Sequence, residues 1–104
     1  MRAWFRKPGR GLYIIQVENT LEALQKVVGG YIEVIQMAPE WAIVCDEEGL
    51  IKGKHFNCNI EVDGTVLKFY GNLLLVGTEG EEFCDFPYQC DKQIKKMELW
   101  RYKK

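Results

Sequence analysis

The side chains best suited to chemistry lie in one segment, residues 45–59, whose sequence is CDEEGLIKGKHFNCN. Its three consecutive acids, at 46–48, could work as a general acid and base, and His55, the chain's single histidine, could act as a base. The chain contains no serine, and no nucleophile motif flanks His55. Three acids in a row at a strand end point in different directions, and a calcium loop needs acids at alternating positions. We therefore predict a turn at 46–49, no catalytic residue and no enzymatic activity.

The second half of this segment is better suited to binding. Two lysines offer positive charge to a phosphate, a histidine and two asparagines can hydrogen-bond to a base edge, and a tryptophan in the preceding strand offers a stacking face. The two ends of the chain add aromatic side chains beside cations. The predicted ligand-binding residues are Trp4, Arg6, Trp41, Lys52, Lys54, His55, Asn57, Asn59 and Arg101. The alternative is that the aromatics belong to the core and the lysines to a solvated surface.

Four cysteines raise the question of a metal site or disulfides. Cys45, Cys58, Cys84 and Cys90 form no C-x-x-C pair, and structural zinc sites usually bring their ligands in close pairs. We expect free thiols, no metal and no cofactor. Cys45 ends an apolar run, so its thiol is expected to be buried.

The size and charge of the chain indicate how many domains it forms and which kinds of partner it suits. The 104 residues correspond to one domain spanning 1–104. Residues 1–30 carry five basic and two acidic side chains, residues 31–85 three and eleven, and residues 86–104 six and two. The net charge of −1 argues against nucleic acid as a partner, because phosphate contacts need a strong positive patch. No apolar run suits a membrane span or a secretory signal, so we expect a cytoplasmic protein with no membrane partner.

The elements that must position these residues can be read from periodicity and turn signals. Asn19 and Glu22 resemble a capping box, and Gly29-Gly30 a helix stop, which together predict a helix over about 19–29. Predicted strands are 2–7, 12–17, 31–37 (as a central strand), 41–45, 59–62, 65–70 and 71–77, with Asp63-Gly64 as a type I′ turn and 78–82 as an exposed acidic loop. A terminal helix is expected after Pro87, carrying Cys90, Ile94 and Met97 on one face, although residues 97–102 could also be extended. The order predicts an α+β fold with a small, mostly antiparallel sheet.

Three blocks, NTLEALQKVVGGYIEVI, VCDEEGLIKGKHFN and YGNLLLVG, occur in this order. They resemble the family called domain of unknown function 3846, over roughly residues 8–80. That family carries a similar L-x-A-L-Q-x-x-V-G-G-x-I-E segment followed by an acidic E-E-G segment, and Asp46 stands where it more often has asparagine. The resemblance implies an origin in bacteriophages or mobile genetic elements and brings no established activity or catalytic residues.

From this resemblance we expect a non-enzymatic protein that counters bacterial immunity inside the host cell. The first hypothesis is sequestration of a small nucleotide signal by a homo-oligomer, because short chains build enclosed sites at subunit interfaces. The alternative is a protein–protein inhibitor that occludes a host defence nuclease or effector. The third is a small hydrolytic enzyme that uses His55 or the acids at 46–48.

Overall fold

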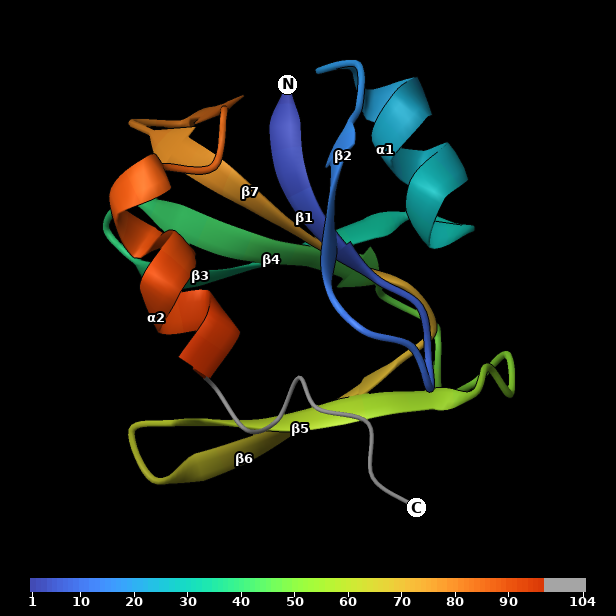
Figure 1. The fold of residues 1–104 in the computed structure, drawn as a ribbon. Helices are drawn as coiled ribbons and strands as arrows, with labels where there is room; N and C mark the ends of the chain where they lie inside the picture. Colours follow the sequence, from blue (N-terminus) through green and yellow to red (C-terminus); the bar gives the residue numbers. More distant parts are fainter. Residues whose placement is uncertain (97–104) are drawn as a thin grey trace.

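The computed structural model describes residues 1–96 (Figure 1). Its elements are β1 (Arg2–Arg6), β2 (Tyr13–Gln16), α1 (Leu21–Val28), β3 (Ile32–Ala38), β4 (Trp41–Asp46), β5 (Phe56–Val62), β6 (Thr65–Tyr70), β7 (Leu73–Glu79), β8 (Glu82–Cys84), the 3-10 turn η1 (Tyr88–Cys90) and α2 (Asp91–Lys96). The fold is α+β with antiparallel strand pairing, as the sequence predicts.

Two sheets make up the β structure. The main sheet has the order β2-β1-β7-β4-β3, and β8 pairs with the second half of β7. The β5–β6 hairpin forms a separate two-stranded sheet. Figure 1 shows this hairpin below the main sheet and α1 on the opposite side. The main sheet is therefore the middle layer of the molecule.

The central strand β7 serves two cores, one on each face of the main sheet. Leu73 and Leu75 pack toward the β5–β6 hairpin and α2, whereas Leu74 and Val76 pack toward α1. All four side chains are fully buried. Each contributes about 2 kcal/mol relative to an exposed side chain. The uninterrupted apolar run in the sequence therefore reflects burial on both faces.

Two turn predictions are confirmed by backbone geometry. Asp63 and Gly64 have φ values of 51° and 81°, which is the left-handed pair that a type I′ turn requires. Gly29 ends α1 with a φ of 82°. The terminal helix is confirmed as well, because Cys90 and Ile94 are buried in η1 and α2, while the predicted Met97 lies outside the described residues.

Three local predictions were wrong. The N-cap of α1 is Thr20, whose Oγ1 accepts a hydrogen bond from the Ala23 N–H at 3.1 Å, because the Asn19 amide instead donates to the Phe83 carbonyl at 2.9 Å. The 78–82 segment is acidic and largely exposed as predicted, but it is a loop only at 80–81, because β7 extends to Glu79 and β8 begins at Glu82.

The position of β3 was the third wrong prediction. β3 is an edge strand of the main sheet, not a central one. It has apolar side chains on both faces because Ile35 packs toward the hairpin and Ile32 toward α1, while Val34 stays 42% exposed. Within residues 1–96, no helix has the length and apolar character needed to cross a membrane.

Candidate functional site

The predicted turn after β4 is a compact loop, residues 47–55, which projects beyond one end of β5 (Figure 1). Backbone hydrogen bonds run inside it, from the Lys52 N–H to the Glu48 carbonyl at 2.9 Å and from the Lys54 N–H to the Gly49 carbonyl at 3.0 Å. We call this segment the 47–55 loop. Its internal hydrogen bonds give it a defined shape even though it lies at the surface.

Asp46, at the end of β4, anchors this loop. Its carboxylate is buried and accepts hydrogen bonds from the Lys54 Nζ at 2.6 Å and the Lys52 Nζ at 3.0 Å. The second carboxylate oxygen accepts from the Glu48 N–H at 2.9 Å. Burial by itself would raise the pKa of the Asp46 carboxyl. The hydrogen bonds from Lys54, the Glu48 amide and Lys52 outweigh burial and lower the pKa to about 2.

The same two lysines tie the loop to α1. The Lys54 Nζ donates to the carbonyls of Val28 and Gly29 at 2.8 and 3.1 Å, and the Lys52 Nζ lies 3.4 Å from the Gly29 carbonyl. Cations are favourable there because the carbonyls at a helix C-terminus carry partial negative charge. Both ammonium groups, predicted to bind a ligand, therefore already hold Asp46 and the end of α1.

Asn57 and Arg6 form a second internal link. Asn57 is 6% exposed and Arg6 is 2% exposed. The Arg6 Nη1 donates to the Asn57 Oδ1 at 2.7 Å and to the Asn57 carbonyl at 2.8 Å. The Asn57 amide donates in turn to the carbonyls of Arg6 and Gly71 at 3.0 and 2.8 Å. This pair joins β1, β5 and the turn between β6 and β7, and neither side chain lies on an open surface.

The predicted aromatic residues are core residues. Trp41 is 3% exposed and packs against Phe86, with ring centroids 5.6 Å apart. Trp4 is 5% exposed, and its indole N–H donates to the Asp91 carboxylate at 2.9 Å. The expectation that Trp41 offers a stacking face beside the loop does not match this burial. Both indole rings fill core volume that smaller side chains would leave empty.

The remaining predicted residues are dispersed. His55 and Asn59 are exposed, on the loop and on β5. Arg101 lies outside the described residues. The structure therefore brings Lys52 and Lys54 together around Asp46 and joins Arg6 to Asn57, but the described members of the predicted set do not converge on one cavity.

The loop also displays apolar residues, which the sequence analysis missed. Ile51 is 84% exposed and Leu50 is 65% exposed at the tip, and Tyr31, where β3 begins, is 68% exposed. The signal was present in the sequence, because two adjacent branched apolar residues stand between two glycines in an otherwise polar turn. The adjacent exposed pair Leu50 and Ile51 marks a candidate interaction surface.

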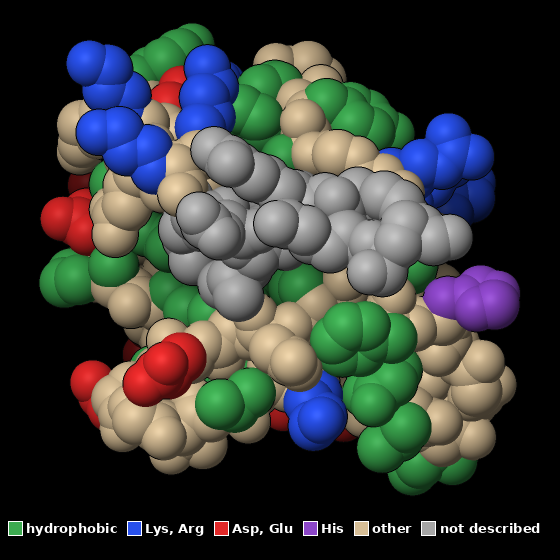
Figure 2. Space-filling view, turned by 60° about the horizontal axis from the view of Figure 1, so that its bottom comes forward, with side chains coloured by type: hydrophobic (Ala, Val, Ile, Leu, Met, Phe, Trp, Pro, Cys, Tyr) green, Lys and Arg blue, Asp and Glu red, His purple; other side chains and the backbone are tan. Residues whose placement is uncertain are grey.

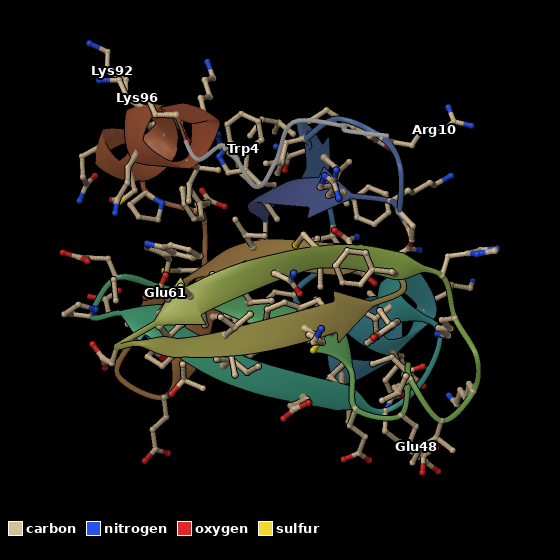
Figure 3. All side chains as sticks on the ribbon, turned by 90° about the horizontal axis from the view of Figure 1, so that it is seen from below. Trp4, Arg10, Glu48, Glu61, Lys92 and Lys96 are labelled. Atoms are coloured by element: carbon tan, nitrogen blue, oxygen red, sulfur yellow. The ribbon has the colours of Figure 1, made fainter. Side chains whose placement is uncertain are left out.

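A groove of about 250 Å³ adjoins the loop, between the main sheet and β6. It is lined by Glu33, Ile35, Cys45, Asp46, Glu47, Gly49, Leu50, Leu67, Lys68, Phe69 and Tyr70. Figure 3 shows β3 and β6 running alongside one another in this region. We call it the β3–β6 groove.

Charge is distributed unevenly around the surface. Figure 3 places Lys92, Lys96 and Arg10 along the side of α2 and the β1–β2 turn, and Glu48 near the opposite side of the molecule. In Figure 2 most of the visible basic side chains lie in the upper part of the view, and a single one lies among the acidic and apolar side chains of the lower part. The basic side chains of α2 and the β1–β2 turn therefore lie on a different side of the molecule from the exposed Glu48.

The four cysteines are free thiols. Burial raises the pKa of the Cys45 and Cys58 thiols to about 12. Neither is therefore a thiolate nucleophile at neutral pH. Among residues 1–96, no three His, Cys, Asp or Glu side chains gather into a group that could hold a metal ion.

Replacing Asp46 with asparagine should destabilise the protein in a pH-dependent way. At neutral pH we expect a loss of about 2 kcal/mol in the free energy of unfolding, because two ammonium groups lose their carboxylate. The pKa of Asp46 is about 2 in the folded protein against the ordinary 3.8, so the unfolded chain takes up the proton first as the pH falls. The stabilisation is therefore complete above about pH 4 and disappears as the pH falls toward 2.

Urea unfolding at several pH values checks this prediction. The matched control is Glu48→Gln, which changes an exposed neighbouring acid and should alter stability by less than about 0.5 kcal/mol. A difference between Asp46→Asn and wild type that stays constant down to pH 2 would contradict the assigned pKa.

Comparison with known proteins assigns the chain to a family but gives no activity for it. No curated protein and no solved structure matches the chain. A family model described as a domain of unknown function, DUF3846, matches residues 1–98, a longer stretch than the roughly 8–80 of the resemblance, and the chain belongs to this family.

Proposed function

We propose that the chain is a non-enzymatic binding protein that docks on another protein through the 47–55 loop and the adjoining β3–β6 groove, and occludes a working surface of that partner. The observation that carries this proposal is the exposed pair Leu50 and Ile51. They lie on a loop that Lys52 and Lys54 fasten to Asp46 and to the end of α1. A rigid loop loses little conformational entropy on binding, so its apolar contacts translate into affinity.

The contacts with Asp46 explain why the two lysines of the loop reach inward. Lys52 and Lys54 hold Asp46, and the apolar side chains at the tip are left facing solvent. An exposed leucine or isoleucine forgoes the roughly 2 kcal/mol of stabilisation that burying such a side chain provides. Their exposure therefore does not help the chain to fold. A partner surface that covers them would recover this free energy.

The family context gives the proposal its biological setting. We propose that a phage or mobile element uses the protein inside a bacterial host, and that the partner is a defence nuclease or effector. Sequestration of a small nucleotide by a homo-oligomer has less support, because Trp4, Trp41, Arg6 and Asn57 are buried and make internal contacts. Hydrolysis has less support still, because His55 is exposed and the two most buried thiols resist deprotonation.

A photoreactive amino acid at Ile51 tests the proposed docking surface. Expressed in a bacterial host, this variant should crosslink to one dominant host protein, whereas the same group at Leu21, an apolar residue 57% exposed on α1, should not. Against that partner, Leu50→Ser with Ile51→Ser should weaken binding about thirtyfold, as for a central contact. Thermal stability should stay unchanged, because both side chains are exposed.

Two outcomes would contradict the proposal. One is the same crosslinking pattern from Ile51 and Leu21. The other is tight calorimetric binding of a cyclic or ADP-ribose-type nucleotide by a protein that crosslinks to no host partner, which would favour nucleotide sequestration instead.

A further inference from the structure

We infer that the β3–β6 groove receives an extended segment of the partner, which pairs with the edge of β6 that no described strand occupies and places an apolar and a basic side chain into the groove. This inference rests on the proposed function in one respect, that the partner is a protein. Beyond the proposed function, it specifies that the bound segment of the partner is extended and which side chains that segment carries.

The lining of the groove shows that β6 presents its edge. Four consecutive residues of β6, 67–70, line the groove. The side chains of Leu67 and Phe69 face the core, whereas Lys68 between them is exposed. Successive side chains of a strand point to opposite faces, so side chains alone would place only every second residue at the groove. Because four consecutive residues line it, the backbone of β6 must form part of the groove wall.

The register of the hairpin identifies which backbone groups are free on this edge. A two-residue turn pairs Val62 with Thr65, and the turn hydrogen bond makes this a hydrogen-bonded pair. Such pairs alternate along an antiparallel ladder. The N–H and C=O groups of Leu67 therefore face β5, and those of Val66 and Lys68 face outward. No described strand pairs with them.

The interior of the groove differs between its two ends. Toward the middle of β3, Ile35 and Leu67 form an apolar end. Toward the 47–55 loop, Glu33 and Glu47 supply carboxylates. The Asp46 carboxylate also lies there, but two lysines already compensate its charge.

These two ends define the segment that fits. In a strand paired with β6, every second side chain would point into the groove. One of these would meet the apolar end, and the next, two residues along, would meet Glu33 and Glu47. A lysine or arginine at that position complements both acids. We therefore expect an extended segment with an apolar-x-basic pattern on its inward face.

A second copy of this chain fits the edge less well. Pairing two β6 strands would bring the exposed Lys68 side chains of both copies onto a shared edge. Exposed lysines on an edge strand disfavour self-association. The charge pattern thus favours a basic partner segment over self-pairing.

Capped peptides on the wild-type protein test the inference without knowledge of the partner. The probe is a peptide of about seven residues that alternates threonine with valine and carries lysine at its central inward position. Hydrogen exchange at the Val66 and Lys68 amides should slow about tenfold at saturating peptide, because these N–H groups become bonded. A peptide with glutamate instead of lysine should bind at least about tenfold more weakly.

Two further comparisons separate backbone pairing from charge. Lys68→Pro removes an outward N–H at an edge position that tolerates proline, and it should abolish peptide binding, whereas Lys68→Thr keeps the N–H and should retain it. If Lys68→Pro fails to fold, N-methylation of one edge of the peptide removes the same hydrogen bonds. Glu33→Gln with Glu47→Gln should erase the preference for lysine.

Unchanged exchange at Val66 and Lys68, or equal affinity for the lysine and glutamate peptides, would overturn the inference. A host protein crosslinked at Ile51 together with unchanged exchange would overturn the strand pairing and leave the proposed function in place. Slowed exchange with no partner crosslinked at Ile51 would support the groove and count against the proposed function.

Discussion

Gly77→Ala should destabilise the protein by about 3 kcal/mol, the largest effect expected from adding a single methyl group to this fold. A Cβ built on Gly77 would lie 2.1 Å from the Asp85 carbonyl oxygen and 3.0 Å from the Cys84 carbonyl oxygen. These backbone atoms belong to the last residue of β8 and to the residue after it, and they cannot rotate away as a side chain could. The segment is also fixed to β1, because the Phe86 N–H donates to the Arg2 carbonyl at 2.8 Å.

Urea unfolding followed by circular dichroism measures this effect. The transition midpoint of Gly77→Ala should fall by about 2 M, given the denaturant sensitivity of a domain of this size. The matched control is Gly11→Ala, because a Cβ at Gly11 meets nothing within 4 Å, and its midpoint should stay close to wild type. A Gly77→Ala midpoint equal to that of the control would show that the segment after β8 does not lie against β7.

Asn57→Ala should cost about 3 kcal/mol, although the sequence analysis placed this residue in a ligand site. The substitution removes the acceptor for the buried Arg6 guanidinium and the donors to the carbonyls of Arg6 and Gly71. Among the described residues, the Arg6 Nε already has no hydrogen-bond partner. Arg6 would therefore keep little compensation for its burial, and uncompensated buried charge is expensive.

A neighbouring asparagine provides the control for this prediction. Asn59 lies on the same strand and is exposed, so Asn59→Ala should change stability by less than about 0.5 kcal/mol. A double-mutant cycle of Asn57→Ala with Arg6→Met should give a coupling energy of at least about 1 kcal/mol. Equal unfolding free energies for Asn57→Ala and Asn59→Ala would contradict the structural role of Asn57.

The comparison of the two asparagines shows where sequence reasoning about the site fails. Asn57 and Asn59 stand two residues apart, and alternation along a regular strand would place them on the same face. A register shift in the β5–β6 ladder between Phe56 and Cys58 breaks this regularity, and Asn57 turns to Arg6 while Asn59 stays in solvent. Such a single-residue shift in strand pairing cannot be recognised from the residue types of the segment.

The prediction that the lysines of the 47–55 loop bind a phosphate fails for a different reason. Their types and spacing suit a phosphate, and the same positive charge suits the Asp46 carboxylate and the carbonyls that end α1. Those partners come from β4 and from a helix more than twenty residues earlier. Their proximity depends on the path of the chain, which local sequence does not specify.

The sequence by itself determined the fold class, α1 and its glycine stop, the Asp63-Gly64 hairpin and the apolar run that becomes β7. Each of these depends on the local periodicity of apolar residues or on the backbone freedom of one or two residues. Only the tertiary structure decided that β3 is an edge, that Gly77 faces a backbone carbonyl, and that the 47–55 loop turns its lysines inward and its Ile51 outward. These features arise from contacts between segments far apart in the chain, where close packing and charge pairing select one arrangement among several that the local sequence would allow.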